Sequence, residues 1–167
     1  QGLYGSEAHA AAADAAGDNL VAVFNMDMIA WDSNADGALD IHTRLTGNPG
    51  YAADLVIASA FTNAVARYGF TGQLRPQIDP SGEPDSDHAS FWDYGFAGVL
   101  AIEDYNDFND DNYHTTGDTL ASLAPSWNYY VRFLKACLAT VADLAVPVDR
   151  VAFDALEVAL APATPVP

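Results

Sequence analysis

Two apolar segments constrain most strongly what this chain can fold into. Residues 20–31, LVAVFNMDMIAW, are mostly apolar and are bounded by polar residues, and residues 98–103, GVLAIE, form a second apolar run. Such runs are typical of strands that are buried on both faces of a sheet. Strands of this kind need a layer of helices on each face, so the two runs indicate an α/β protein.

Helical and strand-like segments alternate with these runs. Apolar spacing, capping residues and a proline near a first turn predict helices at residues 6–17, 51–68, 86–94 and 125–145. Ser6 and Ser86 are the expected N-caps of the first and third helices. Two further strands are expected at residues 38–44 and 74–78. The alternation predicts a three-layer α/β sandwich, in which a mostly parallel mixed sheet has helices on both faces.

Length and charge narrow the function classes. The 167 residues suffice for one domain with a sizeable core. A net charge of −17 argues against nucleic acid and anionic membrane surfaces as partners, because both would repel the chain. No apolar run approaches the roughly 20 residues needed to span a bilayer. The single cysteine, Cys137, excludes an internal disulfide and is expected to be a buried packing thiol.

Three polar segments are candidates for a binding site. Asp27 lies near the end of the first apolar run, residues 86–88 follow an expected strand, and His114 lies in an acidic loop after the second run. In α/β sheets, ligand-binding residues collect at the carboxyl ends of strands. An unpaired aspartate in a buried strand is costly, and only six Lys and Arg residues are present to pair with it. A metal ion would satisfy it, since zinc accepts carboxylate oxygen and imidazole nitrogen; the alternative for His114 is a spectator in a solvated loop.

Four ordered motifs add a family resemblance. QGLYGS, NMDMI, SDHASF with a following YGFAG, and YHTTGDTL together resemble the di-zinc aminopeptidases of the bacterial leucyl aminopeptidase type, whose relatives are the glutaminyl cyclases and glutamate carboxypeptidases. The resemblance implies an α/β fold with two zinc ions. It implies that Asp27 is a ligand of one zinc and His114 a ligand of the other. Tyr113 matches a catalytic tyrosine that, in some members, steadies the tetrahedral oxyanion.

The chain also departs from this family pattern. In the family, a Glu-Glu pair that supplies the general base and a zinc ligand stands just before the residue equivalent to Gln1. A histidine ligand and the bridging aspartate lie further upstream. We therefore expect residues 1–146 to be the C-terminal portion of a zinc peptidase catalytic domain, and residues 147–167 to be a tail or linker. Alone, the chain is expected to be inactive and to bind zinc weakly.

The resemblance implies a zinc-dependent exopeptidase that removes N-terminal residues from peptides. One alternative is a glutaminyl cyclase-like enzyme with a single zinc, and another is a non-catalytic scaffold derived from a peptidase. Strands missing from the sheet would leave an open edge, so we expect a complementing N-terminal polypeptide or self-association. The acidic, lysine-poor surface and the resemblance together favour an extracellular or periplasmic location.

The other polar residues of these motifs have more modest expected roles. Ser86, Asp87 and His88 are adjacent in sequence, so they cannot converge on one carbonyl as a serine-protease triad does. We expect Ser86 to cap its helix, and Asp87 or His88 to form hydrogen bonds around the metal site. Asp118 either orients a ligand in the same way or caps a turn.

A second possible cation site begins as a calcium loop does. Asp32, Asn34, Asp36 and Gly37 follow the D-x-N-x-D-G pattern. The twelfth position is Thr43, where calcium would require a bidentate glutamate, so a tight hairpin turn between two strands is the favoured interpretation. The acidic residues between 104 and 111 are a further calcium candidate, with a solvated loop as the alternative.

Overall fold

The computed structural model describes residues 2–105 and 110–145, and these form a mixed four-stranded sheet. Its strands are β1 (Val23–Met26), β2 (Ala38–His42), β3 (Arg75–Asp79) and β4 (Gly98–Glu103). The spatial order is β1-β4-β2-β3. β1 and β4 are parallel, as are β2 and β3, and the two pairs meet through an antiparallel β2–β4 pairing. Two of the three pairings are therefore parallel.

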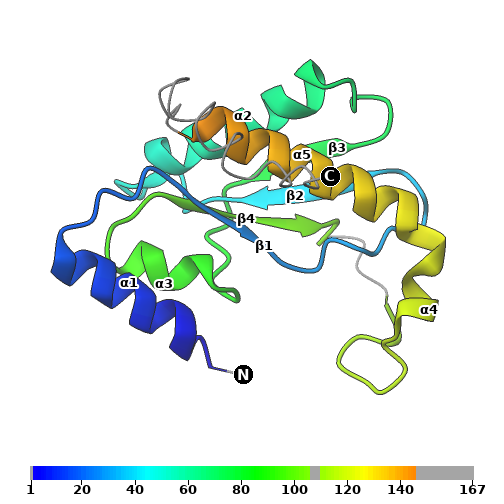
Figure 1. Ribbon diagram of the computed structural model, residues 1–167, viewed down its shortest axis with the longest axis horizontal. Coiled ribbons are helices and arrows are strands. Elements are labelled where there is room, and N and C mark those ends of the chain that lie inside the picture. The colour runs from blue at the N-terminus through cyan, green and yellow to red at the C-terminus, as the bar shows by residue number, and fades with distance from the viewer. Residues whose placement is uncertain (1, 106–109, 146–167) are drawn as a thin grey trace, which may run out of the picture.

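Helices cover both faces of this sheet (Figure 1). α1 (Tyr4–Ala16) and α3 (His88–Asp93) lie on one side, and α2 (Tyr51–Arg67) and α5 (Trp127–Leu144) lie on the other. A short helix, α4 (Leu120–Leu123), and the 3₁₀ turn η1 (Ala124–Ser126) lead into α5. The predicted α/β sandwich is confirmed. Among the described residues, no helix is both long and apolar enough to cross a bilayer.

The main core lies between the sheet and the pair α2 and α5. Leu39 and Ile41 of β2 and Val99 and Ala101 of β4 point into it, because alternate residues of a strand face the same side. Each large apolar side chain that is fully buried stabilises the fold by about 1.5–3 kcal/mol. Cys137 belongs to this core, and burial raises the pKa of its thiol to about 12, so the prediction of a packing cysteine is confirmed.

A buried ion pair joins both helical layers to the sheet. Arg44, just after β2, donates from Nε and Nη2 to the two carboxylate oxygens of Asp54, each over 2.7 Å. Asp54 lies in the first turn of α2 and also accepts the backbone N–H groups of Arg44 and Gly98. The Arg44 guanidinium further donates to the carbonyl of Phe96 and lies over the Trp92 ring of α3. The pair thus fixes β2, α2 and the start of β4 relative to one another.

The strand expected at residues 20–31 is shorter and more exposed than predicted. β1 has four residues; three are half-buried and Met26 is 43% exposed. Within the described part of the chain, β1 pairs with β4 alone, so its other edge has no neighbour. Burial on both faces was therefore a wrong expectation for this run, whereas it is right for β4, all six residues of which are buried.

Three local predictions are also wrong. Residues 32–37 do form a turn, but β4 lies between β1 and β2, so the turn does not close a hairpin. α1 begins at Tyr4, and the Ser6 hydroxyl inside it donates to the Leu3 carbonyl and bonds to Ser90 of α3 instead of capping. α3 begins at His88 without a side-chain cap. The predicted tail, residues 147–167, lies outside the described residues.

We predict that Arg44→Met destabilises the protein by about 3–5 kcal/mol, because it leaves the Asp54 carboxylate buried without its partner. Methionine keeps most of the aliphatic stem, so the decrease in the free energy of unfolding measures mainly the effect of removing the charge. Urea unfolding followed by far-UV circular dichroism measures it. The control is Arg67→Met, which removes the exposed pair with Asp143 and should cost less than about 1 kcal/mol. Similar losses in the two variants would contradict the assigned role of the buried pair.

Candidate metal and substrate site

A cavity of about 460 Å³ lies on the α3 side of the sheet, where Leu100 and Ile102 of β4 form part of its wall. Its volume falls in the range of small-ligand sites. The residues that line it are Asp27, Met28, Glu83, Asp85, Ser86, Leu100, Ile102, Tyr105, Tyr113 and His114. Four residues that the sequence singled out, Asp27, Ser86, Tyr113 and His114, therefore meet in one place.

Asp27 directly follows β1, and its backbone N–H continues the ladder to Ala101 over 3.1 Å. Its Oδ2 accepts the hydroxyl of Ser86 over 2.6 Å, across 59 residues of sequence. The Ser86 oxygen in turn accepts the Asn25 side-chain amide over 2.8 Å. Ser86 is buried, so this relay fixes the orientation of the Asp27 carboxylate and leaves its other oxygen for a ligand. Ser86 therefore positions Asp27 and does not cap α3.

The segment after Asp27 is held by a residue that the sequence interpretation missed. Met28 has a φ of 49°, a left-handed conformation that is uncommon for residues other than glycine. Glu103, at the end of β4, donates its backbone N–H to the Met28 carbonyl and accepts the Trp31 N–H on its side chain over 2.8 Å. Burial raises the pKa of Glu103 to about 8. A glutamate that ends an apolar strand was the only sequence signal for this contact.

His114 and Tyr113 reach the cavity from the loop beyond β4. Their rings stack with centroids 3.8 Å apart and planes 18° apart. His114 has a φ of 58°, in the left-handed region that histidine enters more often than most residues. Both residues are exposed as well as lining the cavity. The loop therefore presents an imidazole and a phenol to the same space as Asp27.

The remaining expected site residues lie elsewhere. Asp87 precedes α3 and is exposed, and Asp118 is exposed in the loop before α4; neither lines the cavity. His88 is fully buried, and burial lowers the pKa of its imidazole to about 4. Its Nε2–H donates to the Glu83 carbonyl over 2.8 Å, so it supports the loop that carries Glu83 and does not contact Asp27 through any described hydrogen bond.

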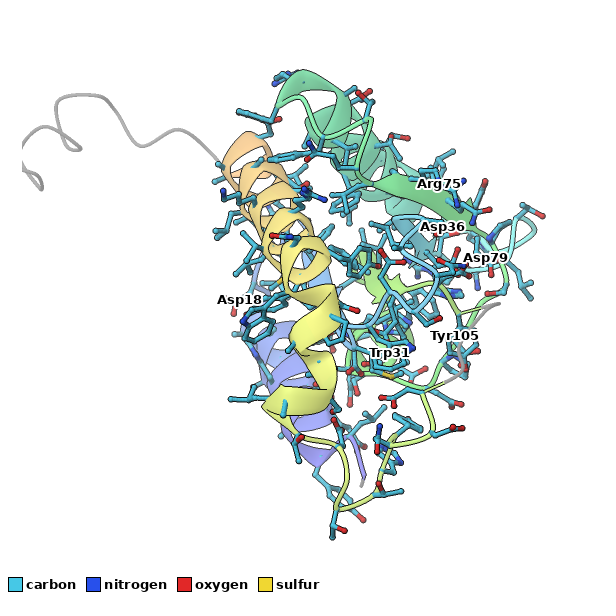
Figure 2. All side chains as sticks on the ribbon, turned by 90° about the vertical axis from the view of Figure 1, so that its right-hand side faces the viewer. Asp18, Trp31, Asp36, Arg75, Asp79 and Tyr105 are labelled. Carbon is cyan, nitrogen blue, oxygen red and sulfur yellow. The ribbon has the colours of Figure 1, made fainter. Side chains whose placement is uncertain are left out.

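The candidate calcium residues between positions 32 and 37 stabilise a turn. Asp32 accepts the N–H groups of Asp36 and Gly37, and Asn34 also accepts that of Asp36. The Asp36 carboxylate accepts the Ala38 N–H over 2.8 Å and pairs with Arg75, beside which Figure 2 shows it. These oxygens are thus engaged by the backbone and a guanidinium instead of converging on an open centre.

β3 runs opposite to β1 and β4, because β2 is antiparallel to β4. The expectation that residues 86–88 follow a strand ending beside Asp27 is therefore wrong. Residues 80–86 return along the α3 side of the sheet and bring Ser86 to Asp27. In the described ranges 2–105 and 110–145, no three His, Cys, Asp or Glu side chains are grouped as a metal site would require.

The model of peptidase family M28 matches residues 1–141. Among solved structures, the LapA aminopeptidase of Legionella pneumophila superposes with a TM-score of 0.66 at 20% identity, covering 89% of this chain and 37% of that one. The zinc aminopeptidase BSAP of Bacillus subtilis gives 0.60 at 20% identity, covering 85% and 32%. An aminopeptidase of Aneurinibacillus sp. strain AM-1 gives 0.57 at 24% identity, covering 89% and 33%.

These structures share the α/β fold, and the chain spans about a third of the length of each. The family match covers both segments that meet in the cavity, the one around Asp27 and the one around His114. On this match, the chain belongs to peptidase family M28.

Proposed function

We propose that the chain contributes the C-terminal part of the active site of a zinc-dependent aminopeptidase. The observation that carries the proposal is the convergence of Asp27, Tyr113 and His114 in one cavity from two distant segments. Membership of peptidase family M28 and the similarity to bacterial aminopeptidases, one of them described as a zinc enzyme, support it. The substrate would be a peptide or aminoacyl amide with a free N-terminus.

The residues present fit part of a zinc site. Asp27 offers a carboxylate oxygen and His114 an imidazole nitrogen, which are ligands that zinc accepts. A zinc site takes three or four protein ligands, so two donors from the described residues do not complete one. Zinc, when bound, polarises a substrate carbonyl and lowers the pKa of its water. The further ligands and the general base would come from a segment outside the described residues.

The chain's own residues have defined tasks in this proposal. Ser86 and Asn25 fix the Asp27 carboxylate through the relay of hydrogen bonds described above. Glu103 holds the backbone that follows Asp27. The Tyr113 hydroxyl donates a hydrogen bond to the substrate carbonyl oxygen as that oxygen acquires negative charge. Stacking of His114 on Tyr113 holds the two rings in a fixed orientation relative to each other.

A complementing polypeptide or self-association would cover the outer edge of the sheet, at β1. The edge of β1 that has no neighbour among residues 2–105 and 110–145 lies beside an apolar groove of about 240 Å³, lined by Val21, Phe24 and Leu144 among others. Val131, Leu138 and Val141 on α5 are also exposed. An unpaired edge next to exposed apolar side chains favours the addition of another strand.

Three finer points belong to the same proposal. Two zinc ions are proposed, because Asp27 and His114 match ligands of different metals in the family that the chain resembles. Calcium at residues 32–37 is a secondary hypothesis, since the ion would have to displace Arg75 from Asp36. An extracellular or periplasmic location is proposed from the net charge of −17 and from the resemblance.

We predict that the 167-residue chain alone binds zinc weakly. Its binding free energy should be far smaller than the roughly 10–16 kcal/mol typical of complete structural sites. Calorimetric titration measures this. Addition of a polypeptide that supplies the missing ligands should give two tight sites per chain and hydrolysis of leucyl amide. Two tightly bound ions and hydrolysis by the chain alone would show that the site is complete within it and is misassigned here.

We predict that His114→Ala abolishes peptidase activity in the complemented protein, because the variant lacks a metal ligand. Tyr113→Phe should lower kcat by about 10²–10³-fold, the usual effect of removing one oxyanion donor. Both residues are exposed, so the urea unfolding curve should change little. The matched control is His9→Ala, which removes an exposed histidine of α1 outside the cavity. Undiminished turnover by His114→Ala would rule out its role as a ligand.

A further inference from the structure

The cavity carries negative charge beyond its proposed metal ligand. Glu83 and Asp85, from the connection between β3 and α3, line it together with Asp27. None of the lysines and arginines that the structure describes lines it, and three of the arginines are paired with aspartates elsewhere. The charges of Glu83 and Asp85 therefore have no cationic partner among the described residues.

The acidic segment is held in place. The Glu83 carbonyl accepts the buried His88 imidazole, the Glu83 carboxylate accepts the Asp85 N–H over 3.1 Å, and Ser86 is bonded to Asp27. Burial raises the pKa of the Tyr105 phenol, and the nearby charges of Glu83 and Asp85 raise it further.

Apart from Ser86, the rest of the wall is apolar or aromatic. Met28, Leu100 and Ile102 contribute aliphatic surface, and Tyr105 and Tyr113 contribute rings. A site with aliphatic walls and fixed carboxylates fits a side chain with an apolar stem and a cationic head, because such side chains bury the stem and keep the charge paired. A leucine side chain would contact the apolar wall but leave both carboxylates without a cationic partner. An acidic side chain would be repelled.

Building on the proposed function, we infer that the site prefers substrates with N-terminal arginine or lysine. The side-chain stem lies along Met28, Leu100 and Ile102, and the guanidinium or ammonium group pairs with Glu83 and Asp85. Glu83 and Asp85 are thus specificity residues, and Asp27 and His114 keep their separate task. The competing use of the two carboxylates is to hold the α-ammonium group, which every unblocked N-terminal residue carries.

Binding to the full 167-residue chain without metal separates these two uses. N-acetyl-argininamide carries only the side-chain cation, leucinamide carries only the α-ammonium group, and N-acetyl-leucinamide carries neither. We expect N-acetyl-argininamide to bind most tightly of the three, measured by NMR titration. Equal binding of the two acetylated amides, or tighter binding of leucinamide than of N-acetyl-argininamide, would overturn the inference.

Two variants locate the effect. Glu83→Gln should weaken binding of N-acetyl-argininamide about tenfold, as expected for a half-buried, charged hydrogen bond. Asp85→Asn should weaken it about threefold, because Asp85 is more exposed. Asp93→Asn, at the far end of α3 and exposed, should change nothing. Unchanged binding in both Glu83→Gln and Asp85→Asn would contradict the assignment.

Turnover by the complemented protein distinguishes this inference from the proposed function. We expect kcat/KM for arginyl and lysyl amides to exceed that for leucyl amide, and the ratio to fall about tenfold in Glu83→Gln. Hydrolysis that favours leucyl amide and is insensitive to Glu83→Gln would overturn the inference and leave the aminopeptidase intact. Failure to hydrolyse any of the three would overturn the proposed function, and the metal-free binding would still decide the preference of the cavity.

Discussion

The arrangement of this molecule depends on the buried pair of Arg44 and Asp54. Charges are costly to bury, and this pair is tolerated because its hydrogen bonds are almost fully satisfied: two guanidinium contacts and two backbone N–H groups reach the carboxylate. Its members lie just after β2 and in the first turn of α2, and Gly98 begins β4. The pair therefore fixes β2 and the start of β4 relative to α2. From this fixed start, β4 runs toward the cavity.

The cavity is built on contacts between segments that leave the sheet in different directions. β1 and β4 end on the same side and provide Asp27 and the wall formed by Leu100 and Ile102. Because β3 runs the other way, the chain must return along the α3 side, which brings Ser86 to Asp27 and Glu83 to the wall. The same return path that positions a proposed metal ligand also supplies the acidic charge of the cavity, so ligand geometry and substrate preference share one structural cause.

Much of the fold could be predicted from the sequence. The apolar run of β4, the helical spacing of α2 and the proline near the start of α5 are local patterns, and all three elements lie where those patterns indicate. The predicted burial of β1 failed because an apolar run reports hydrophobicity and not the presence of a neighbouring strand. The serine caps failed because both hydroxyls have other partners: the Leu3 carbonyl just before α1 and Ser90 of α3 for Ser6, and Asp27 for Ser86.

The sequence by itself determined the class of fold and four members of the cavity, Asp27, Ser86, Tyr113 and His114, because periodicity and motifs are properties of short segments. Only the tertiary structure decided which residues surround them. The contacts of Ser86 with Asp27, of Glu103 with the backbone after Asp27, and of Arg44 with Asp54 all follow from the strand order β1-β4-β2-β3. Strand order arises from pairing between distant segments, and no local pattern of side chains encodes it.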